Sequence, residues 1–149
     1  MKKNIQLLEL SNQIKKIAED IYNNLGSGFE ERIYQNALAI ELRLRNIKYL
    51  KEMEIEIFYK GYSVGVDKPD FLVLFDRAFI VEIKVTDKIK DDNRMQLKSY
   101  CTSMQFHSIF GDFMGGMILA FPKSDLKELS SVRMFVTDYK FKVLCDEDK

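Results

Sequence analysis

Residues 68–85 read KPDFLVLFDRAFIVEIKV, and this stretch decides the fold. Two apolar runs, 71–75 and 78–85, flank a short polar break, a pattern that predicts a β-hairpin. Both runs are apolar on both of their faces, which is typical of interior strands that are covered by helices. The sequence therefore predicts a hairpin at the centre of a sheet.

Three charged residues interrupt this hairpin. Asp70 opens the first run, and Glu82 and Lys84 lie inside the second. Because residues two apart in a strand face the same side, Glu82 and Lys84 share a face with Ile80, and Asp70 shares one with Leu72. A solvent-facing Glu-Lys pair on an edge strand would explain two of the three charges. Asp70 favours a functional cluster instead, because a hairpin brings the start of one strand beside the later part of the next.

The rest of the chain supplies helices before the hairpin, and a helix and more strands after it. A helix is expected over about residues 11–25, with Ser11 as N-cap and Gly26 at its end. Ser27 and Glu30 have the spacing of a capping box for a second helix that runs to about Arg45. The remaining expected elements are strands at 53–59, 62–66, 115–121, 132–136 and 139–143, a helix from Asp91 or Asp92 to about 105, and a short helix at 125–129. This order predicts an α/β fold, a mixed β-sheet flanked by helices.

Composition narrows the class of protein. The length of 149 residues fits one domain over residues 1–149, and equal numbers of basic and acidic residues, 23 each, give zero net charge. A strongly basic nucleic-acid binder is therefore not expected. No apolar run reaches membrane-spanning length, no signal peptide is recognisable, and the two cysteines have no metal-ligand spacing. We expect a cytoplasmic protein with no membrane partner, and a homodimer is compatible with the sequence.

The cluster of two acids and a lysine suits the hydrolysis of phosphodiester bonds. Hard divalent cations prefer carboxylate oxygens, and a bound cation polarises a phosphoryl oxygen and lowers the pKa of its water. A nearby lysine such as Lys84 stabilises the charge that develops on the phosphate.

The chain also resembles a known family in these residues. Pro69-Asp70 followed by Glu82-Ile83-Lys84 resembles the core signature of the PD-(D/E)XK nuclease superfamily. Two further patterns match in order, over roughly residues 15–121: Gly28, Glu31 and Tyr34 resemble the motif of the GxxExxY proteins, and Gln96 and Tyr100 resemble the QxxxY element of RecB-type members.

The resemblance implies a restriction-endonuclease-like core and a role for each matching residue. Asp70 and Glu82 would bind Mg²⁺ or Mn²⁺ together with the backbone carbonyl of Ile83, and Glu31 would be a supporting ligand. Lys84 would be the catalytic lysine. Gln96, Tyr100 and Tyr34 would support the cluster. On the helix pattern alone, Glu31 could equally lie at the margin of an apolar stripe, and Gln96 and Tyr100 could be a surface and a core residue.

Two functions remain open from the sequence. The first is a metal-dependent nuclease, with nucleic acid as partner and DNA expected in preference to RNA. The second is a non-catalytic nuclease-fold module that binds nucleic acid or a protein. The presence of all three of Asp70, Glu82 and Lys84 favours the enzyme.

Overall fold

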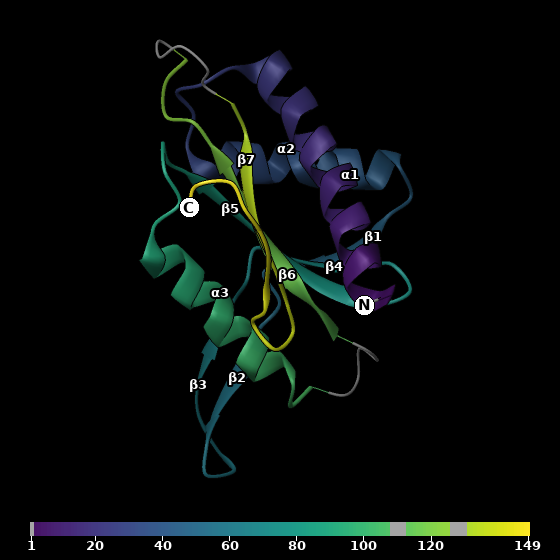
Figure 1. Cartoon of the computed structure of the whole chain (residues 1–149), viewed down its shortest axis with the longest axis vertical. Helices are drawn as coiled ribbons and strands as arrows, with labels where there is room; N and C mark the ends of the chain where they lie inside the picture. The colour runs from purple at the N-terminus through teal and green to yellow at the C-terminus, as the bar shows by residue number, and fades with distance from the viewer. Residues whose placement is uncertain (1, 108–112, 126–130) are drawn as a thin grey trace.

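The computed structural model describes residues 2–107, 113–125 and 131–149. Figure 1 shows the elements in chain order. They are α1 (Lys2–Leu25), α2 (Glu31–Leu44), β1 (Lys48–Lys51), β2 (Ile55–Tyr59), β3 (Tyr62–Asp67), β4 (Phe71–Leu74), β5 (Ala78–Val85), α3 (Asp91–Met104), β6 (Phe113–Phe121), β7 (Arg133–Asp138) and β8 (Val143–Asp146).

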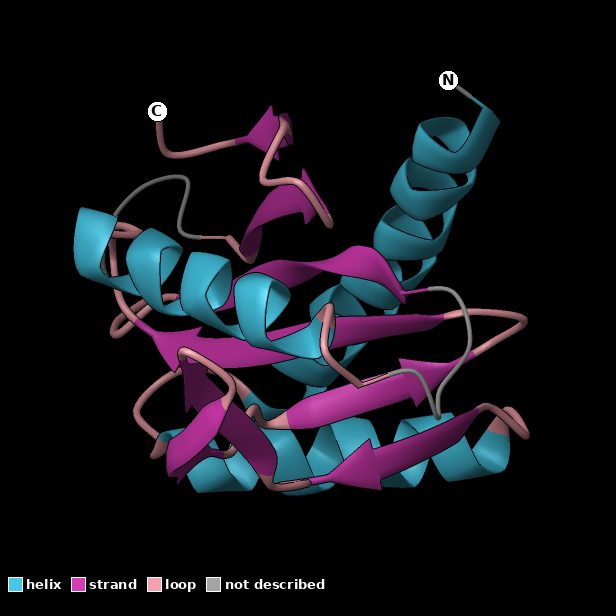
Figure 2. Cartoon of the chain, turned by 90° about the horizontal axis from the view of Figure 1, so that it is seen from below, coloured by secondary structure: helices cyan, strands magenta, loops and turns pink. Residues whose placement is uncertain are grey.

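A mixed sheet forms the centre of the fold, as the sequence predicts. Its strand order is β1-β4-β5-β6-β7-β8, with β5 and β6 parallel and the remaining neighbours antiparallel. Helices α1 and α2 pack on one face of the sheet, and α3 packs on the other. Figure 2 shows the strands of the sheet side by side, with helices in front of the sheet and behind it. The expected α/β class is therefore confirmed.

The hairpin of the opening stretch is confirmed as β4 and β5. Its two faces belong to two different cores, as the alternation requires. Leu72 and Ile80 pack in a cluster with α3. Val81 and Ile83 pack in the larger cluster with α1 and α2. Because both of its faces are buried, β5 is a central strand of the sheet.

Helix α1 begins earlier than expected. Ser11 is not an N-cap but a fully buried residue in the middle of the helix, which starts at Lys2. Leu7 is also buried, so the buried apolar stripe that contains Ile14 extends toward the N-terminus. The helix is therefore longer at this end than expected. Gly26 does end α1, with φ of 76° and its N–H donated to Tyr22 O at 2.7 Å.

The expected capping box of α2 is wrong. Glu30 occupies the N-cap position of α2, and its side chain makes no capping hydrogen bond. Ser27 Oγ instead accepts a hydrogen bond from the N–H of Asp125 at 3.2 Å. Similarly, Lys90 rather than Asp91 or Asp92 holds the N-cap position of α3. The helices exist where the pattern predicts them, but tertiary contacts decide how their ends are satisfied.

The chain end also differs from expectation. Of the strand expected at 139–143, residues 139–142 form a tight connection and only Val143 is in a strand, the first residue of β8, because Asp138 Oδ1 accepts hydrogen bonds from the N–H groups of Lys140 and Lys142, at 3.0 and 2.8 Å. Phe141 takes a positive φ of 62° in this turn. Strand β1 was not predicted as a separate element. The helix expected at 125–129 lies, apart from its first residue, outside the described residues.

Strands β2 and β3 form a hairpin of their own, outside the main sheet. They confirm the two expected strands and the Lys60-Gly61 turn between them. Figure 1 shows the hairpin extending beyond α3, away from the main sheet. Ile55 is buried against α3, whereas every residue of β3 except Asp67 is exposed. The exposed strand β3 is therefore followed in the chain, almost at once, by the Pro69-Asp70 segment.

Gly115 allows β6 to approach β7 closely. It lies beside a register shift between β5 and β6 and has φ of +138°, and an added Cβ would overlap the carbonyl oxygen of Thr137. Gly115→Ala is expected to destabilise the protein by about 2–4 kcal/mol. Gly65→Ala is the control, because its Cβ meets open space and its φ is not positive. Urea unfolding that shows equal losses for both variants would contradict this account of the strand contact.

Candidate active site

Two carboxylates take the place of backbone partners where the β4–β5 ladder opens. The ladder ends at the pair Phe71–Val81, and the next pair along is Asp70 and Glu82. The N–H of Asp70 donates to Glu82 Oε1 at 2.6 Å. The N–H of Ile83 donates to Asp70 Oδ2 at 2.7 Å. Each acid therefore satisfies a backbone donor of the other strand, which holds the two carboxylates side by side.

Burial makes these two acids hard to ionise. Glu82 is only 3% exposed, and burial raises its pKa from 4.5 to about 8, with the neighbouring Asp70 charge as the next contribution. Burial also raises the pKa of Asp70, while the hydrogen bond from Ile83 N–H lowers it in part. A buried and a half-buried acid placed side by side repel each other when both are charged, so the site favours a proton or a cation between them.

Glu31 and Lys84 complete the charged cluster from two directions. Glu31, in the first turn of α2, accepts a long hydrogen bond of 3.4 Å from the N–H of Val85. Its charge contributes to the raised pKa of both Asp70 and Glu82. Lys84 is half-buried in β5, and its positive charge lowers the pKa of the same two acids without offsetting their burial. The structure thus brings three acids and one lysine together around the end of β5.

Gln35 belongs to this cluster and was not predicted from the sequence. It lies one turn after Glu31 on α2, is 9% exposed, and its side chain hydrogen-bonds the Asp70 carboxylate, which lowers the pKa of that acid. The spacing of four residues from Glu31 is the signal that could have identified it. The sequence points to the neighbouring Tyr34 instead, because Tyr34 belongs both to the apolar stripe of the helix and to the sequence motif.

The two tyrosines of the motifs have different surroundings. Tyr34 is fully buried, stacks on Phe121 with ring centroids 4.3 Å apart, and donates its hydroxyl to Gly26 O at 2.7 Å. It fixes the start of α2 and thereby the position of Glu31. Tyr100 on α3 is buried, and its pKa is raised first by burial and then by the charges of Glu82, Asp67 and Asp70. Tyr100 therefore faces the acidic pair.

Gln96 does not join the cluster. Its side chain is exposed on α3, and among the described residues no hydrogen bond connects it to Asp70 or Glu82. Leu97 and Tyr100 occupy the buried side of the helix instead. The expectation that Gln96 points at the acids is thus not met in this conformation.

The family of the chain follows from its match to a protein-family model. A model of the PD-(D/E)XK nuclease superfamily matches residues 8–131, which include every residue of the charged cluster. The chain belongs to this superfamily. The mixed sheet flanked by helices is consistent with the PD-(D/E)XK core. No curated protein and no solved structure gives a significant match to the chain.

The acids of this PD-(D/E)XK chain are not arranged as a closed cation cage. Within residues 2–107, 113–125 and 131–149, no three Asp, Glu, His or Cys side chains converge closely enough to enclose a metal ion. None of the described helices is both long and apolar enough to cross a membrane.

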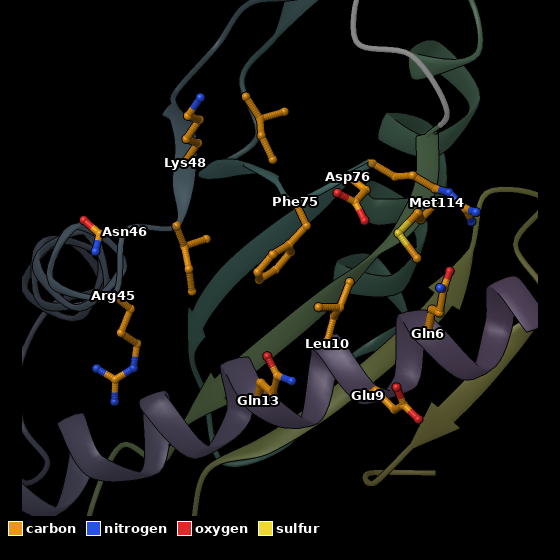
Figure 3. A pocket seen from close by; sticks show the side chains of 13 residues that line it. Gln6, Glu9, Leu10, Gln13, Arg45, Asn46, Lys48, Phe75, Asp76 and Met114 are labelled. Carbon is orange, nitrogen blue, oxygen red and sulfur yellow. The ribbon is translucent and has the colours of Figure 1, made fainter.

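A larger pocket lies at the opposite end of the same hairpin. It has a volume of about 700 Å³ and opens between α1 and the β4–β5 turn, where Phe75, Asp76 and Met114 line it (Figure 3). Gln6, Glu9 and Gln13 approach from α1. Its lining carries both signs of charge, and none of the acids of the cluster reaches it. The chemistry of the motif residues is thus separate from this pocket.

Proposed function

We propose that the chain is a metal-dependent nuclease that hydrolyses phosphodiester bonds of nucleic acid. The observation that carries the proposal is the pair of adjacent acids, buried Glu82 and half-buried Asp70, with Lys84 next to them. Burial raises the pKa of both acids, and the Asp70 charge raises that of Glu82 further, so keeping both charged costs stability and their placement calls for another explanation. Membership of the PD-(D/E)XK superfamily supports a nuclease-like activity.

The donor set of the site fits a divalent cation such as Mg²⁺ or Mn²⁺. Asp70 and Glu82 provide hard carboxylate oxygens, the Ile83 carbonyl is available on β5, and Glu31 can join through a water. A cation here would favour the charged forms of both acids against the burial that raises their pKa values. When bound, it supplies Lewis-acid polarisation of the phosphate and a more acidic water.

The side chains around the cation would then have separate roles in catalysis. Lys84 stabilises the charge that builds on the phosphate, because its ammonium lies beside the acids without being neutralised by a described ion pair. Glu31 orients or deprotonates the attacking water from α2. Tyr100 keeps its proton, because burial and the nearby charge of Glu82 both raise its pKa, and it would serve as a neutral hydrogen-bond donor on the α3 side of the acids.

We place the chain within the GxxExxY branch with a RecB-like QxxxY element, on Gly28, Glu31, Tyr34, Gln96 and Tyr100. The exposure of Gln96 weakens the QxxxY part of this placement. Nucleic acid is the proposed substrate, with DNA in preference to RNA.

A cleavage assay tests the proposal. Single- and double-stranded DNA and RNA are incubated with the purified chain and Mg²⁺ or Mn²⁺. We expect cleavage that needs the cation and stops on chelation. The affinity for the substrate should fall only shallowly with salt, because a chain of zero net charge makes few phosphate contacts.

The competing function is a non-catalytic module on the same fold. It is favoured by the hydrogen bonds that already occupy Asp70 Oδ2 and Glu82 Oε1, since the acids then have a purely structural task. A chain that binds one of these nucleic acids and cuts none of them under any cation would establish the module and refute the enzyme.

A further inference from the structure

A small pocket with an excess of positive charge adjoins the acidic cluster. It has a volume of about 180 Å³, and it is lined by Glu31, Lys84, Val85, Thr86, Lys90, Asn93 and Lys123. Three lysines face one acid there, although the chain as a whole has zero net charge. Two of these lysines, Lys90 and Lys123, belong to no motif discussed above.

The segment that carries Lys123 is fixed to the end of β5. The N–H of Lys123 donates to Asp87 Oδ1 at 3.1 Å. The N–H of Thr86 donates to Phe121 O at 2.9 Å. The residues after β5 and the residues after β6 therefore form one joined rim beside Lys84.

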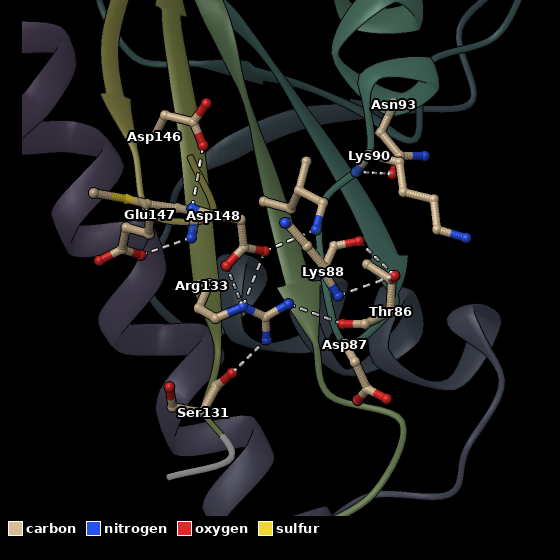
Figure 4. A network of polar contacts seen from close by, with 12 residues as sticks. Thr86, Asp87, Lys88, Lys90, Asn93, Ser131, Arg133, Asp146, Glu147 and Asp148 are labelled. Carbon is tan, nitrogen blue, oxygen red and sulfur yellow. Dashed lines mark hydrogen bonds and ion pairs between the residues drawn. The ribbon is translucent and has the colours of Figure 1, made fainter.

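The segment that carries Lys90 is fixed as well, as Figure 4 shows. The N–H of Lys90 donates to Asn93 Oδ1 at 3.0 Å, and the N–H of Ile89 donates to Asp148 Oδ2 at 2.7 Å. Arg133 Nη2 donates to Thr86 O at 3.0 Å, and Arg133 also binds Asp148. These bonds order the backbone of residues 86–90 before any ligand arrives, which lowers the entropic cost of binding.

We infer that Lys90 and Lys123, with Lys84, form a binding pocket for phosphate groups of a nucleic-acid strand, next to the group that is cut. The inference rests on the proposed function, because the strand is the one that reaches Asp70 and Glu82. The pocket attracts an anion through its lysines, and it shares Glu31 and Lys84 with the cluster, so a continuous strand with several phosphates fits both.

The pocket also explains how a chain of zero net charge can bind the nucleic acid that a nuclease cuts. Phosphate contacts supply most of the sequence-independent affinity for nucleic acid, and they require only local positive charge. Lys90 and Lys123 concentrate that charge at the site while the rest of the surface stays balanced. The ammonium groups lie on exposed residues, so each contact is weak alone and the pair acts together.

The test measures binding separately from cleavage. Fluorescently labelled single-stranded and duplex oligonucleotides are titrated with the full chain in Ca²⁺, whose looser coordination is poorly matched to an Mg²⁺ site. The variants are Lys90→Ala, Lys123→Ala, the double variant, and Lys16→Ala as a charge-matched control from the exposed surface of α1. Thermal unfolding of each variant checks that the fold is kept.

We expect each single variant to weaken binding about 3- to 10-fold and the double variant about 10- to 100-fold, equally for all base sequences. The slope of affinity against salt should fall by about one for each lysine removed. Lys16→Ala should bind like the parent. The shift in Tm caused by Mg²⁺ should not decrease in any of them, because lysines do not ligate a cation.

The possible outcomes distinguish a failure of the phosphate-pocket inference from a failure of the nuclease proposal. If the double variant loses binding and the parent cuts nothing, the phosphate pocket stands and the nuclease proposal fails. If the parent cuts and the double variant keeps the same KM, the pocket is refuted and the nuclease stands. A double variant no weaker than Lys16→Ala, or a parent that binds no oligonucleotide, also refutes the pocket.

Discussion

Replacing Lys84 by alanine is expected to abolish cleavage while leaving cation binding intact. The ammonium of Lys84 supplies charge stabilisation only as the phosphate reacts, and losing one such group typically costs about 100- to 1000-fold in rate. An ammonium cannot ligate a cation, and its removal reduces the positive charge beside Asp70 and Glu82. Cation affinity should therefore stay the same or rise. Cleavage rates and Mg²⁺-dependent shifts in Tm measure the two properties separately.

Asp70→Asn is the matched comparison for Lys84→Ala. Asparagine keeps the shape and an oxygen that can accept the hydrogen bond from Ile83 N–H, but it loses the charge that a cation needs. We expect this variant to lose both cleavage and the Mg²⁺-dependent rise in Tm. Equal Tm shifts in parent and Asp70→Asn would place the ion elsewhere, and full cleavage by Lys84→Ala would remove the catalytic role from this lysine.

Without a cation, the stability of the protein is expected to fall as the pH rises from about 4.5 to about 8. The pKa of Glu82 is raised by burial from 4.5 to about 8, so in this range the folded state binds more protons than the unfolded state. Stability decreases with pH wherever the folded state binds the extra proton. The full shift corresponds to at most about 5 kcal/mol, and a Tm decrease on the order of 10 °C is reasonable for a chain of this length.

Glu82→Gln isolates the origin of this pH dependence. Glutamine resembles the protonated acid and can still accept the hydrogen bond from Asp70 N–H. We expect its Tm to be nearly flat between pH 5 and 8 and to exceed that of the metal-free parent at pH 8. Saturating Mg²⁺ should restore the parent at pH 8. A parent whose Tm rises over this range in chelator would show that the Glu82 carboxylate is not held in a protonated state.

Sequence alone was sufficient for the centre of the fold and for most of the cluster. The apolar runs around Asp70 and Glu82 leave few alternatives to an interior hairpin, because strand periodicity fixes which side chains share a face. The motif that Glu31 shares with Gly28 and Tyr34 singles it out, because the helix pattern alone leaves it equally at the margin of an apolar stripe. The identities of the charged residues were thus readable because they break an otherwise apolar pattern.

The remaining features depended on contacts that a linear pattern does not contain. Gln35 lies four residues after Glu31, but this spacing matters only because α2 lies over Asp70, which the sequence does not show. Ser27 has the spacing of a cap, yet its hydroxyl is used by Asp125 on a distant segment. Residues 139–143 alternate like a strand, yet the side chain of Asp138 binds the backbone that a neighbouring strand would need.

The reciprocal bonds between Asp70 and Glu82 have a consequence for how such chains lose activity over generations. Both acids close the end of a ladder, so replacing either one by a residue without an acceptor oxygen exposes an N–H that must find another partner. Selection for folding alone would therefore preserve an acceptor at both positions, an acid or its amide, in a descendant that no longer cuts anything. Lys84 has no comparable structural duty among the described contacts and would drift first. In relatives of this chain, a lysine at this position is a better marker of a working enzyme than an acceptor oxygen at the other two.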